Sequence, residues 1–262
     1  MRKLHNPIYD TVLVTGASSG IGKALVRQIS VKSSCLILTG RNHTELKQLA
    51  KELPCKTHVV QCDLTCSNDI LKLTNQIKKY KPTCVFNNAG VGYYGELTTL
   101  TTKEINDMVQ LNFSALVEIS QHVGLLWKSK KIPGRLVNIS SIAGNMHLPG
   151  FAVYSATKAA VTTFSITLNE EWSKWGGHVM CSLPGPVKTQ FQKTASRGKV
   201  DKTTAWYAIT PEQCASEIIR ALEKGKIKHI TGFWIRMYNI LSSLTPGWIK
   251  RFLNETKPNP GQ

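Results

Sequence analysis

Acidic residues are scarce in this sequence. Its 262 residues include 16 Asp and Glu against 33 Lys and Arg, which gives a formal net charge of +17. Such a field attracts anions, among them dinucleotides, coenzyme A esters, nucleic acid and anionic membranes. The basic residues are spread along the chain and do not form blocks with interleaved aromatics. We therefore expect no dedicated nucleic-acid surface.

Long hydrophobic runs and paired cysteines are missing as well. No stretch approaches the roughly 18 apolar residues of a membrane span, and residues 1–7 lack the apolar segment of a secretory signal. The seven cysteines are an odd number, and Cys62 with Cys66 has no second pair at zinc spacing. These absences predict reduced thiols, no metal site and a cytoplasmic protein.

Strands and helices alternate along the chain, which predicts an α/β fold: a doubly wound parallel sheet between helices, in three αβα layers. Apolar and β-branched runs predict strands at residues 10–15, 35–39, 57–61, 83–86, 135–141, 178–183 and 228–231. Helical patterns cover residues 43–53, 69–79, 104–127, 154–175 and 211–224. No linker interrupts them, so residues 1–232 are predicted as one domain and residues 233–262 as an amphipathic extension.

A glycine-rich turn follows the first predicted strand. Gly16, Gly20 and Gly22 stand between that strand and a helical pattern. This arrangement can hold a pyrophosphate, because glycines let the backbone approach the phosphates and a helix N-terminus supplies free N–H groups. A P-loop is excluded by register, since Lys23 would need glycine at position 17 and Ser or Thr at position 24, and both are alanine.

The second predicted strand is followed by Gly40 and Arg41. In doubly wound sheets the residue after this strand faces the adenosine ribose. A carboxylate there would bind the 2′-hydroxyl, whereas a guanidinium can hold a 2′-phosphate. The sequence therefore favours NADP(H), with a solvated loop residue as the alternative interpretation of Arg41.

Amide and small residues follow the fourth predicted strand. The run from Asn87 to Gly90 suits close approach of a ligand, although Asn and Gly also favour a plain turn. Asn112 stands inside the predicted helix 104–127 and, if buried, must find hydrogen-bond partners. It is either a structural bracket or a group that holds a water molecule.

Tyr154 and Lys158 are four residues apart and share one face of a predicted helix. A phenol has a pKa of about 10 and exchanges protons poorly at neutral pH, and a neighbouring ammonium lowers that pKa. The pair is therefore a candidate acid/base unit. Thirteen residues before Tyr154, the predicted strand 135–141 ends in two hydroxyls, at the edge where α/β enzymes place their chemistry.

Taken in order, these motifs resemble the short-chain dehydrogenase/reductase family in its single-domain form. The resemblance runs from residue 11 to about 232 and rests on residues 15–22, Asp63, residues 87–90, Asn112, Ser141, Tyr154 with Lys158, and residues 184–189. It implies a Rossmann-like fold with a nicotinamide cofactor across the carboxyl ends of the strands. It also selects Ser141 over Ser140, since the family's serine stands thirteen residues before the tyrosine.

The resemblance implies a role for each site residue. Tyr154 would protonate the carbonyl oxygen, and Ser141 would hydrogen-bond that oxygen. Lys158 would lower the Tyr154 pKa and hold the nicotinamide ribose, and Asn112 would hold a water of a proton relay. The phosphates would meet Gly16, Ser18, Ser19, Gly20, Ile21 and Gly22. The other cofactor contacts would come from Arg41, Asp63 (adenine), Leu64, Asn88 and Gly90 (ribose), Ala89, Tyr154, Lys158, Pro184, Gly185, and Val187 with Thr189 (carboxamide).

The predicted substrate pocket is apolar and aromatic, lined by Val91, Tyr93, Met146, Leu148, Phe151, Phe191, Trp206 and Tyr207. It offers no evident site for a small charged acid, which favours a lipid-like ketone: a 3-oxoacyl chain, a steroid or a retinoid. Residues 190–210 are predicted as a flap over it. The favoured function is an NADP(H)-dependent carbonyl reductase that forms a homodimer or homotetramer. The alternative is a dinucleotide-binding regulatory or membrane-surface protein without turnover.

The C-terminal stretch carries an apolar stripe. Phe233, Met237, Ile240, Leu241 and Leu244 share one helical face, and Thr245 is predicted to cap a second short helix that holds Trp248, Ile249, Phe252 and Leu253. Arg236, Lys250 and Arg251 flank these apolar faces. Two interpretations stay open: a lid or subunit contact, and peripheral attachment to anionic membrane through residues 233–254.

Overall fold

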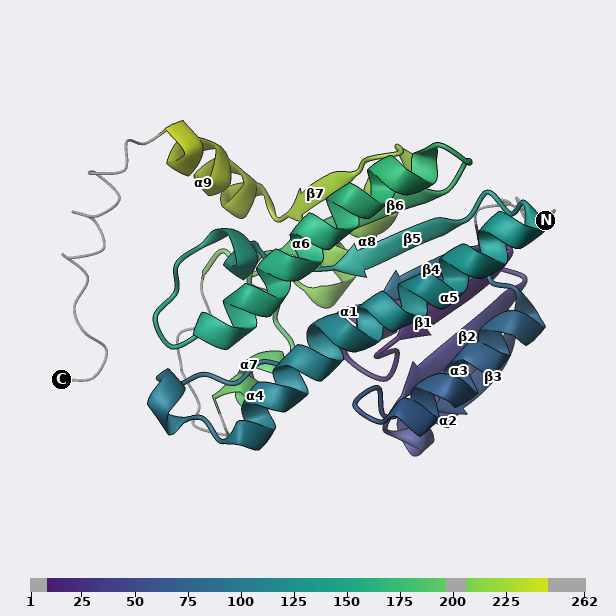
Figure 1. Ribbon diagram of the computed structural model, residues 1–262, viewed down its shortest axis with the longest axis horizontal. Helices are drawn as coiled ribbons and strands as arrows, with labels where there is room; N and C mark the ends of the chain where they lie inside the picture. Colours follow the sequence, from purple (N-terminus) through teal and green to yellow (C-terminus); the bar gives the residue numbers. More distant parts are fainter. Residues whose placement is uncertain (1–8, 197–205, 245–262) are drawn as a thin grey trace.

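Seven short apolar runs form one sheet at the centre of the computed structural model, which describes residues 9–196 and 206–244 (Figure 1). The strands are β1 (Thr11–Thr15), β2 (Cys35–Gly40), β3 (Lys56–Gln61), β4 (Cys84–Asn87), β5 (Arg135–Ile139), β6 (His178–Pro184) and β7 (Lys228–Thr231). They lie in the order β3-β2-β1-β4-β5-β6-β7, and every neighbouring pair is parallel. The predicted doubly wound parallel sheet is confirmed.

Helices cover both faces of this sheet. On one face pack α1 (Gly20–Ser30), α2 (His43–Glu52) and α8 (Pro211–Glu223), and on the other α3 (Ser67–Tyr80), α5 (Ala115–Lys130) and α6 (Ala152–Ser173). Toward the carboxyl edge of the sheet, on the left of Figure 1, lie α4 (Thr102–Val109), α7 (Phe191–Ala195) and α9 (Phe233–Leu244). The three-layer architecture is therefore confirmed. Within residues 9–196 and 206–244, none of the helices combines the length and apolarity needed to span a bilayer.

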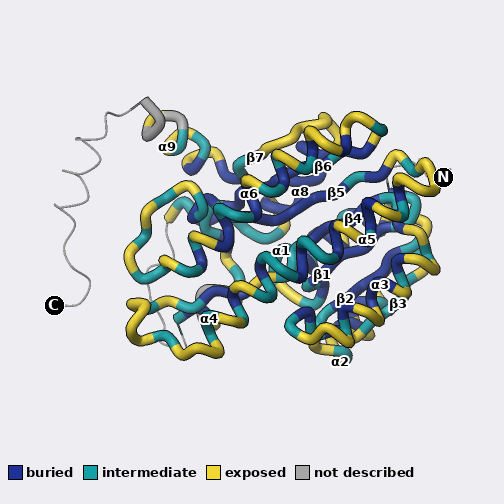
Figure 2. The backbone as a smooth tube through the Cα atoms, in the orientation of Figure 1, coloured by how far each residue is buried: buried dark blue, intermediate teal, exposed yellow. Residues whose placement is uncertain are grey.

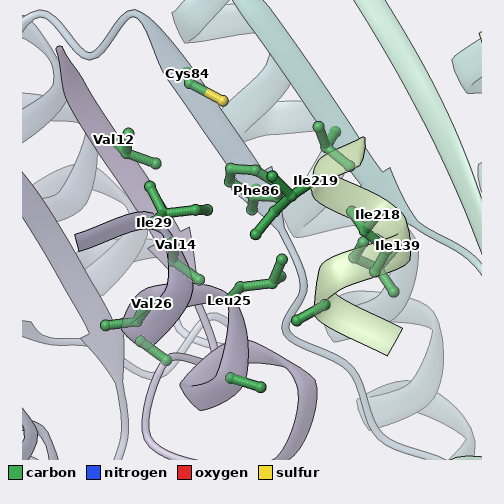
Figure 3. Close-up of a cluster of buried hydrophobic side chains, with 14 of the residues drawn as sticks. Val12, Val14, Leu25, Val26, Ile29, Cys84, Phe86, Ile139, Ile218 and Ile219 are labelled. Carbon is green, nitrogen blue, oxygen red and sulfur yellow. The ribbon is translucent and has the colours of Figure 1, made fainter. Parts of the chain in front are cut away.

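Alternate residues of each strand enter two separate cores. In β1, Val12 and Val14 join the cluster beneath α1 and α8, whereas Leu13 between them joins the cluster beneath α3 and α5. Figure 3 shows the first cluster, in which Leu25 and Ile29 of α1 lie across from β4 and α8. The central strands β1, β4, β5 and β6 are mostly dark blue in Figure 2 because they are buried on both faces, which explains their largely apolar sequence, whereas the edge strand β3 is only partly buried.

The strand order reverses between β1 and β4. From β1 the chain winds through β2 and β3 to one side, and from β4 through β5, β6 and β7 to the other. At such a switch point the connections diverge and leave a crevice at the carboxyl ends of the strands. Gly16 follows β1 and Asn88 follows β4, so these two predicted cofactor residues lie at this crevice.

The predicted continuous helix over residues 104–127 is wrong in one respect. The structure starts α4 at Thr102, forms a π-helical segment over Gln110–Ser114, and continues as α5 to Lys130. The π segment contains Asn112, and such insertions in α-helices occur often at functional sites. Apolar periodicity continues on both sides of the segment, so the sequence pattern did not show the interruption.

Three other predicted elements differ from the structure or lie partly or wholly outside the described residues. The strand predicted over residues 135–141 ends at Ile139, and Ser141 instead caps the 3₁₀ turn Ile142–Asn145. The predicted flap contains α7, while its residues 197–205 lie outside the described residues. The second short helix predicted after Thr245 lies outside them as well.

Candidate active site

The turn after β1 brings the backbones of two neighbouring segments together. Gly16 has a φ of +63°, and a Cβ there would lie 3.0 Å from both Ala89 Cα and Asn88 Nδ2. A Cβ on Gly22 would overlap the Gly16 carbonyl oxygen. Side chains are therefore excluded at both positions, and the turn remains an open backbone cradle.

The N-terminus of α1 offers backbone donors to this cradle. Ser19 is the N-cap residue, and its side chain makes no capping hydrogen bond. The first N–H groups of an α-helix have no partner inside the helix, and the helix dipole adds partial positive charge there. A pyrophosphate fits a site with these properties.

A cleft of about 990 Å³ extends from the glycine turn to α8 and to the segment after β6. A Cβ on Gly20 would lie 3.2 Å from Thr189 Cγ2, so the two segments approach closely. The cleft is lined by Ser18, Ser19, Gly20, Lys23, Ala24, Arg27, Asn42, Glu45, Lys188, Thr189, Gln190, Pro211 and Glu212. Four of the predicted cofactor residues, Ser18, Ser19, Gly20 and Thr189, thus share one cleft.

Thr15 ties the carboxyl ends of β1 and β4 together. Its Oγ1 accepts the N–H groups of Asn88 and Ala89 at 2.9 and 3.0 Å. In return, the Asn88 side-chain amide donates to the carbonyls of Thr15 and Gly16 at 2.9 and 3.3 Å. Sequence reasoning assigned no role to Thr15, although a hydroxyl at the end of a central strand was a usable signal. Asn88, predicted at the ribose, also holds the glycine turn in shape.

The three residues predicted near the adenosine, Arg41, Asp63 and Leu64, have different surroundings. Arg41 is exposed, and its carbonyl accepts a hydrogen bond from Gln61 Nε2 at 3.1 Å. The Asp63 carboxylate accepts the N–H and hydroxyl of Thr65 at 3.0 and 2.8 Å. The Leu64 side chain packs in the core cluster with α3, so it does not face the crevice. Any contact of Leu64 with a dinucleotide would therefore use its backbone.

Asn112 brackets the segment after β4. Its Nδ2 donates to the Val91 carbonyl at 2.8 Å and to Thr157 Oγ1 at 3.1 Å, and its Oδ1 accepts the Val91 N–H at 2.8 Å. A Cβ on Gly90 would lie 3.1 Å from Asn112 Oδ1 and 3.3 Å from Lys158 Nζ. The structure thus shows the structural bracket of the two roles considered, and it places Asn112 next to Lys158 around Gly90.

Tyr154, Ser141 and Lys158 meet beside this bracket. The Ser141 hydroxyl hydrogen-bonds the Tyr154 phenol. Lys158 Nζ donates to the Ile139 carbonyl at 3.0 Å and lies 5.8 Å from the centroid of the Tyr154 ring. All three side chains lie at the carboxyl end of β5, on the same edge of the sheet as the glycine turn.

The neighbouring Ser140 has a different role. Its hydroxyl is buried and bonds the Lys158 carbonyl at 2.7 Å and Thr162 Oγ1 at 2.8 Å. Ser140 therefore fastens α6 to the end of β5, whereas Ser141 reaches the phenol. This division agrees with the choice of Ser141 as the candidate catalytic serine.

Burial is the main cause of the shifted pKa values of Tyr154 and Lys158. It raises the pKa of Tyr154 to about 12, and the hydrogen bond from Ser141 opposes this rise only in part. Burial also lowers the pKa of Lys158 to about 8. At neutral pH the phenol therefore keeps its proton. Lys158 bonds Ile139 and lies 5.8 Å from the centroid of the Tyr154 ring, and that Lys158 lowers the Tyr154 pKa stays a prediction.

An apolar wall surrounds the Tyr154 ring. Phe151 and Phe191 lie with ring centroids 5.7 and 5.5 Å from it, and Tyr94 lies 5.1 Å from Phe151. Of the predicted pocket residues, this cluster contains Val91, Tyr93, Leu148, Phe151 and Phe191. Met146 is not in the cluster, and Trp206 is exposed and packs edge to face against Trp234 of α9, with ring centroids 5.5 Å apart. Aromatic composition alone could not distinguish these orientations.

The segment after β6 is fixed on both sides. Ile209 donates its N–H to the Pro186 carbonyl at 3.1 Å and accepts the Lys188 N–H at 3.0 Å, which leaves Val187 between the two bonds. Pro184 ends β6, and a Cβ on Gly185 would lie 2.6 Å from Ile235 Cγ1 of α9. The predicted cofactor residues of this segment therefore lie beside the crevice, with α9 packed behind Gly185.

Comparison with known proteins gives the class of the protein. The family model described as short chain dehydrogenase matches residues 10–199. This chain is 36% identical over 204 residues to estradiol 17-beta-dehydrogenase 2 of Mus musculus, covering 73% of this chain and 51% of that protein. It is 31% identical over 195 residues to the NADPH-dependent 3-dehydrocapnine reductase of Ornithobacterium rhinotracheale, covering 71% and 68%. The chain belongs to the short-chain dehydrogenase/reductase family of oxidoreductases.

Solved structures agree on the fold. A short-chain dehydrogenase from Sphingobium yanoikuyae in complex with NADPH superposes with a TM-score of 0.80 at 24% identity, covering 97% of this chain and 98% of that one. A 4-hydroxyisoleucine dehydrogenase complexed with NADH superposes with a TM-score of 0.73 at 24% identity, covering 84% and 96%. Similar folds are thus found with either dinucleotide, and the backbone alone does not select one.

Proposed function

We propose that this oxidoreductase uses NADP(H) to interconvert a ketone and a secondary alcohol. The observation that carries the proposal is that Ser141 and the buried Tyr154 and Lys158 lie together at the carboxyl end of β5. Turnover of NADPH with a panel of apolar ketones tests it. A catalytically silent dinucleotide-binding protein would bind NADPH and reduce none of them.

The residues present fit a nicotinamide dinucleotide. The cradle formed by Gly16 and Gly22 and the free N–H groups of α1 suit its pyrophosphate. Asp63, Asn88 and Gly90 lie along the crevice, and Val187 with Thr189 lies on its other side. When bound, the nicotinamide supplies or accepts the hydride. The chain's own residues bind it, exclude water and move the proton.

Tyr154 is the proposed proton donor. With a pKa of about 12 it carries its proton at pH 7 and can deliver it to a carbonyl oxygen as that oxygen gains charge. The Ser141 hydroxyl, which already contacts the phenol, would hydrogen-bond the same oxygen. In the opposite direction Tyr154 must first lose its proton, which a pKa of about 12 disfavours at neutral pH.

Lys158 is the proposed source of the replacement proton. Its pKa of about 8 lies near neutral, so the group can give and regain a proton under ordinary conditions. Asn112 Oδ1 and Lys158 Nζ lie 3.1 and 3.3 Å from where a Cβ on Gly90 would stand. As the resemblance implies, we propose that Asn112 holds a water that connects Lys158 to solvent.

The proposed preference for NADP(H) rests on the residues at the end of β2. Gly40 and Arg41 provide an exposed guanidinium and no carboxylate that would repel a 2′-phosphate. Charge-assisted hydrogen bonds of this kind contribute roughly 1.5–3 kcal/mol. The NADPH-dependent reductase among the relatives supports the proposal.

An apolar, lipid-like ketone is the proposed substrate class. The wall of Phe151, Phe191 and Tyr94 around the phenol suits burial of a hydrocarbon or ring system. The similarity to an estradiol dehydrogenase supports a steroid-like member of this class. All seven cysteines are free, which supports the proposed cytoplasmic location.

A homodimer is the proposed assembly. A groove of about 920 Å³ between α5 and α6 is lined mainly by apolar side chains, and Leu125 stands exposed at it. Glu118 and Lys128 lie along the same groove, ten residues apart on α5. Two antiparallel copies of α5 would set each glutamate opposite the other copy's lysine, as a two-fold axis requires. Analytical ultracentrifugation of Leu125→Glu, which should give a monomer, tests this assembly.

A further inference from the structure

The outer face of α9 is an exposed aromatic surface. It is formed by Trp206, Phe233, Trp234, Met237, Tyr238 and Leu241, all large side chains open to solvent, and we call it the α9 surface. Trp234 lies at its centre, with ring centroids 5.5 Å from Trp206 and 5.4 Å from Phe233. Contiguous apolar patches of this kind mark binding sites on soluble proteins.

The opposite face of α9 fixes how this surface points. Ile235 is buried against Gly185, and Arg236 donates to Glu217 of α8 at 3.2 Å. The same Glu217 oxygen accepts the Gly232 N–H at 3.2 Å, at the start of α9. The helix is thus held to the domain by its inner face. Its aromatic outer face is exposed to solvent, and the helix lies at the upper left of Figure 1.

The residue types of the α9 surface match the interface of a lipid bilayer. Trp and Tyr favour the headgroup region, because their rings are apolar and their N–H or O–H groups remain in contact with water. Phe, Met and Leu favour the acyl region beneath it, as in helices that lie in the plane of a membrane. No acidic side chain belongs to the surface.

Charge favours an anionic bilayer over other apolar partners. The two stretches of sequence that adjoin this surface, residues 197–205 and 245–262, each contain three basic residues and one acidic residue. The stretch after α9 also contains Trp248, Phe252 and Leu253 close to Lys250 and Arg251. The whole chain carries +17. Basic residues beside an apolar helix face strengthen attachment to anionic lipid.

We propose that the α9 surface attaches the protein peripherally to bilayers that contain anionic phospholipid. The attachment itself does not depend on the reaction. Attachment would also affect how the substrate reaches the site, and this second inference rests on the proposed function. Because α9 packs on Gly185 next to the crevice, an attached enzyme would take an apolar ketone directly from the membrane. The experiment below also tests whether a second copy of the chain or another protein covers the α9 surface instead.

Vesicle flotation of the full chain tests the attachment. Vesicles of phosphatidylcholine with phosphatidylserine should carry the protein, vesicles of phosphatidylcholine alone should carry much less, and high salt should release it. Trp234→Glu and Leu241→Glu should each lower binding at least about tenfold, since each removes a buried apolar side chain from the bilayer. Leu71→Glu is the matched control, because Leu71 on α3 is 57% exposed and Leu241 is 58% exposed.

Two results would overturn the proposal. One is equal flotation of the parent, Trp234→Glu and Leu241→Glu. The other is that the parent does not float and that the two variants have a lower mass in solution than the parent. That result would assign the surface to contact with a second copy of the chain. Tyr154→Phe should float like the parent, so loss of turnover and loss of attachment are read separately. Circular dichroism and NADPH affinity of each variant confirm that it is folded.

Discussion

Lys158 Nζ lies 3.0 Å from the carbonyl oxygen of Ile139, to which it donates a hydrogen bond. This bond holds the ammonium at the carboxyl end of β5, 5.8 Å from the centroid of the Tyr154 ring. The two partners of the acid/base unit are therefore tuned separately by burial, which raises one pKa and lowers the other.

Lys158→Met should make the protein more stable at pH 7, although it should lower turnover and cofactor affinity. Burial lowers the Lys158 pKa from 10.5 to about 8, so keeping this amine charged costs about 3 kcal/mol, offset in part by its bond to Ile139. The unfolded chain binds the proton more tightly between these two pKa values, so stability of the parent rises with pH across that window. Below pH 8 the full cost is present.

Urea denaturation at pH 7 and pH 10 measures this effect. The stability gain of Lys158→Met over the parent should shrink as the pH rises, because the parent's lysine becomes neutral. All other titrating groups are shared by the two proteins. A difference that stays constant with pH would show that Lys158 is not held with a lowered pKa.

Gly22→Ala should prevent cofactor binding and destabilise the fold by about 2 kcal/mol or more. The added methyl would overlap the Gly16 carbonyl and crowd the Asn88 amide, so the cradle must open. Gly40→Ala is the control, because its Cβ would meet Ser18 Oγ at an ordinary 3.4 Å. Fluorescence titration with NADPH and thermal melting compare the two. Normal NADPH affinity of Gly22→Ala would contradict the placement of the pyrophosphate.

Thr15→Val should weaken NADPH binding and lower stability by about 2–4 kcal/mol. The change leaves the N–H groups of Asn88 and Ala89 without their acceptor, and each unsatisfied buried group costs about 1–3 kcal/mol. Thr15→Ser keeps the hydroxyl and should behave like the parent apart from a small packing loss. Calorimetric titration and urea denaturation check both. Equal behaviour of the Val and Ser variants would remove Thr15 from the cofactor site.

The chain should use NADPH at least about tenfold better than NADH in kcat/KM, and Arg41→Ala should lose most of that preference. Reversal is expected in the double change Gly40→Asp with Arg41→Ala, since a carboxylate then meets the ribose. Steady-state kinetics with both dinucleotides decides the matter. If Arg41→Ala kept the parent's ratio of kcat/KM for NADPH to that for NADH, the 2′-phosphate would bind elsewhere. One such place is near Lys23, in the cleft that Ser18 and Gly20 also line.

The fold could be predicted from the sequence because each of its signals is local. Runs such as Val12 to Val14 are apolar at every position since parallel strands are buried on both faces. Gly16 and Gly22 were also predictable, because no other residue fits where two backbones touch. Strand ends then placed Ser141, Tyr154 and the cofactor residues at one edge.

What the sequence could not predict depends on long-range contacts. The π segment contains Asn112, whose side chain bonds Val91, 21 residues away. The pKa of Tyr154 depends on the burial of its phenol, and spacing four on a helix does not determine that burial. The packing of Trp206 depends on α9, which follows it by a helix and a strand.

The most direct test of the account is single-turnover reduction of an apolar ketone by Tyr154→Phe loaded with NADPH. Phenylalanine keeps the ring packed between Phe151 and Phe191 and removes only the hydroxyl that carries the proton. NADPH affinity should stay within about threefold of the parent, since about 0.6 kcal/mol covers that change. The rate should fall about a thousandfold, which is within the usual contribution of general acid catalysis. Reduction at a rate near that of the parent would contradict the assignment of Tyr154 as the proton donor.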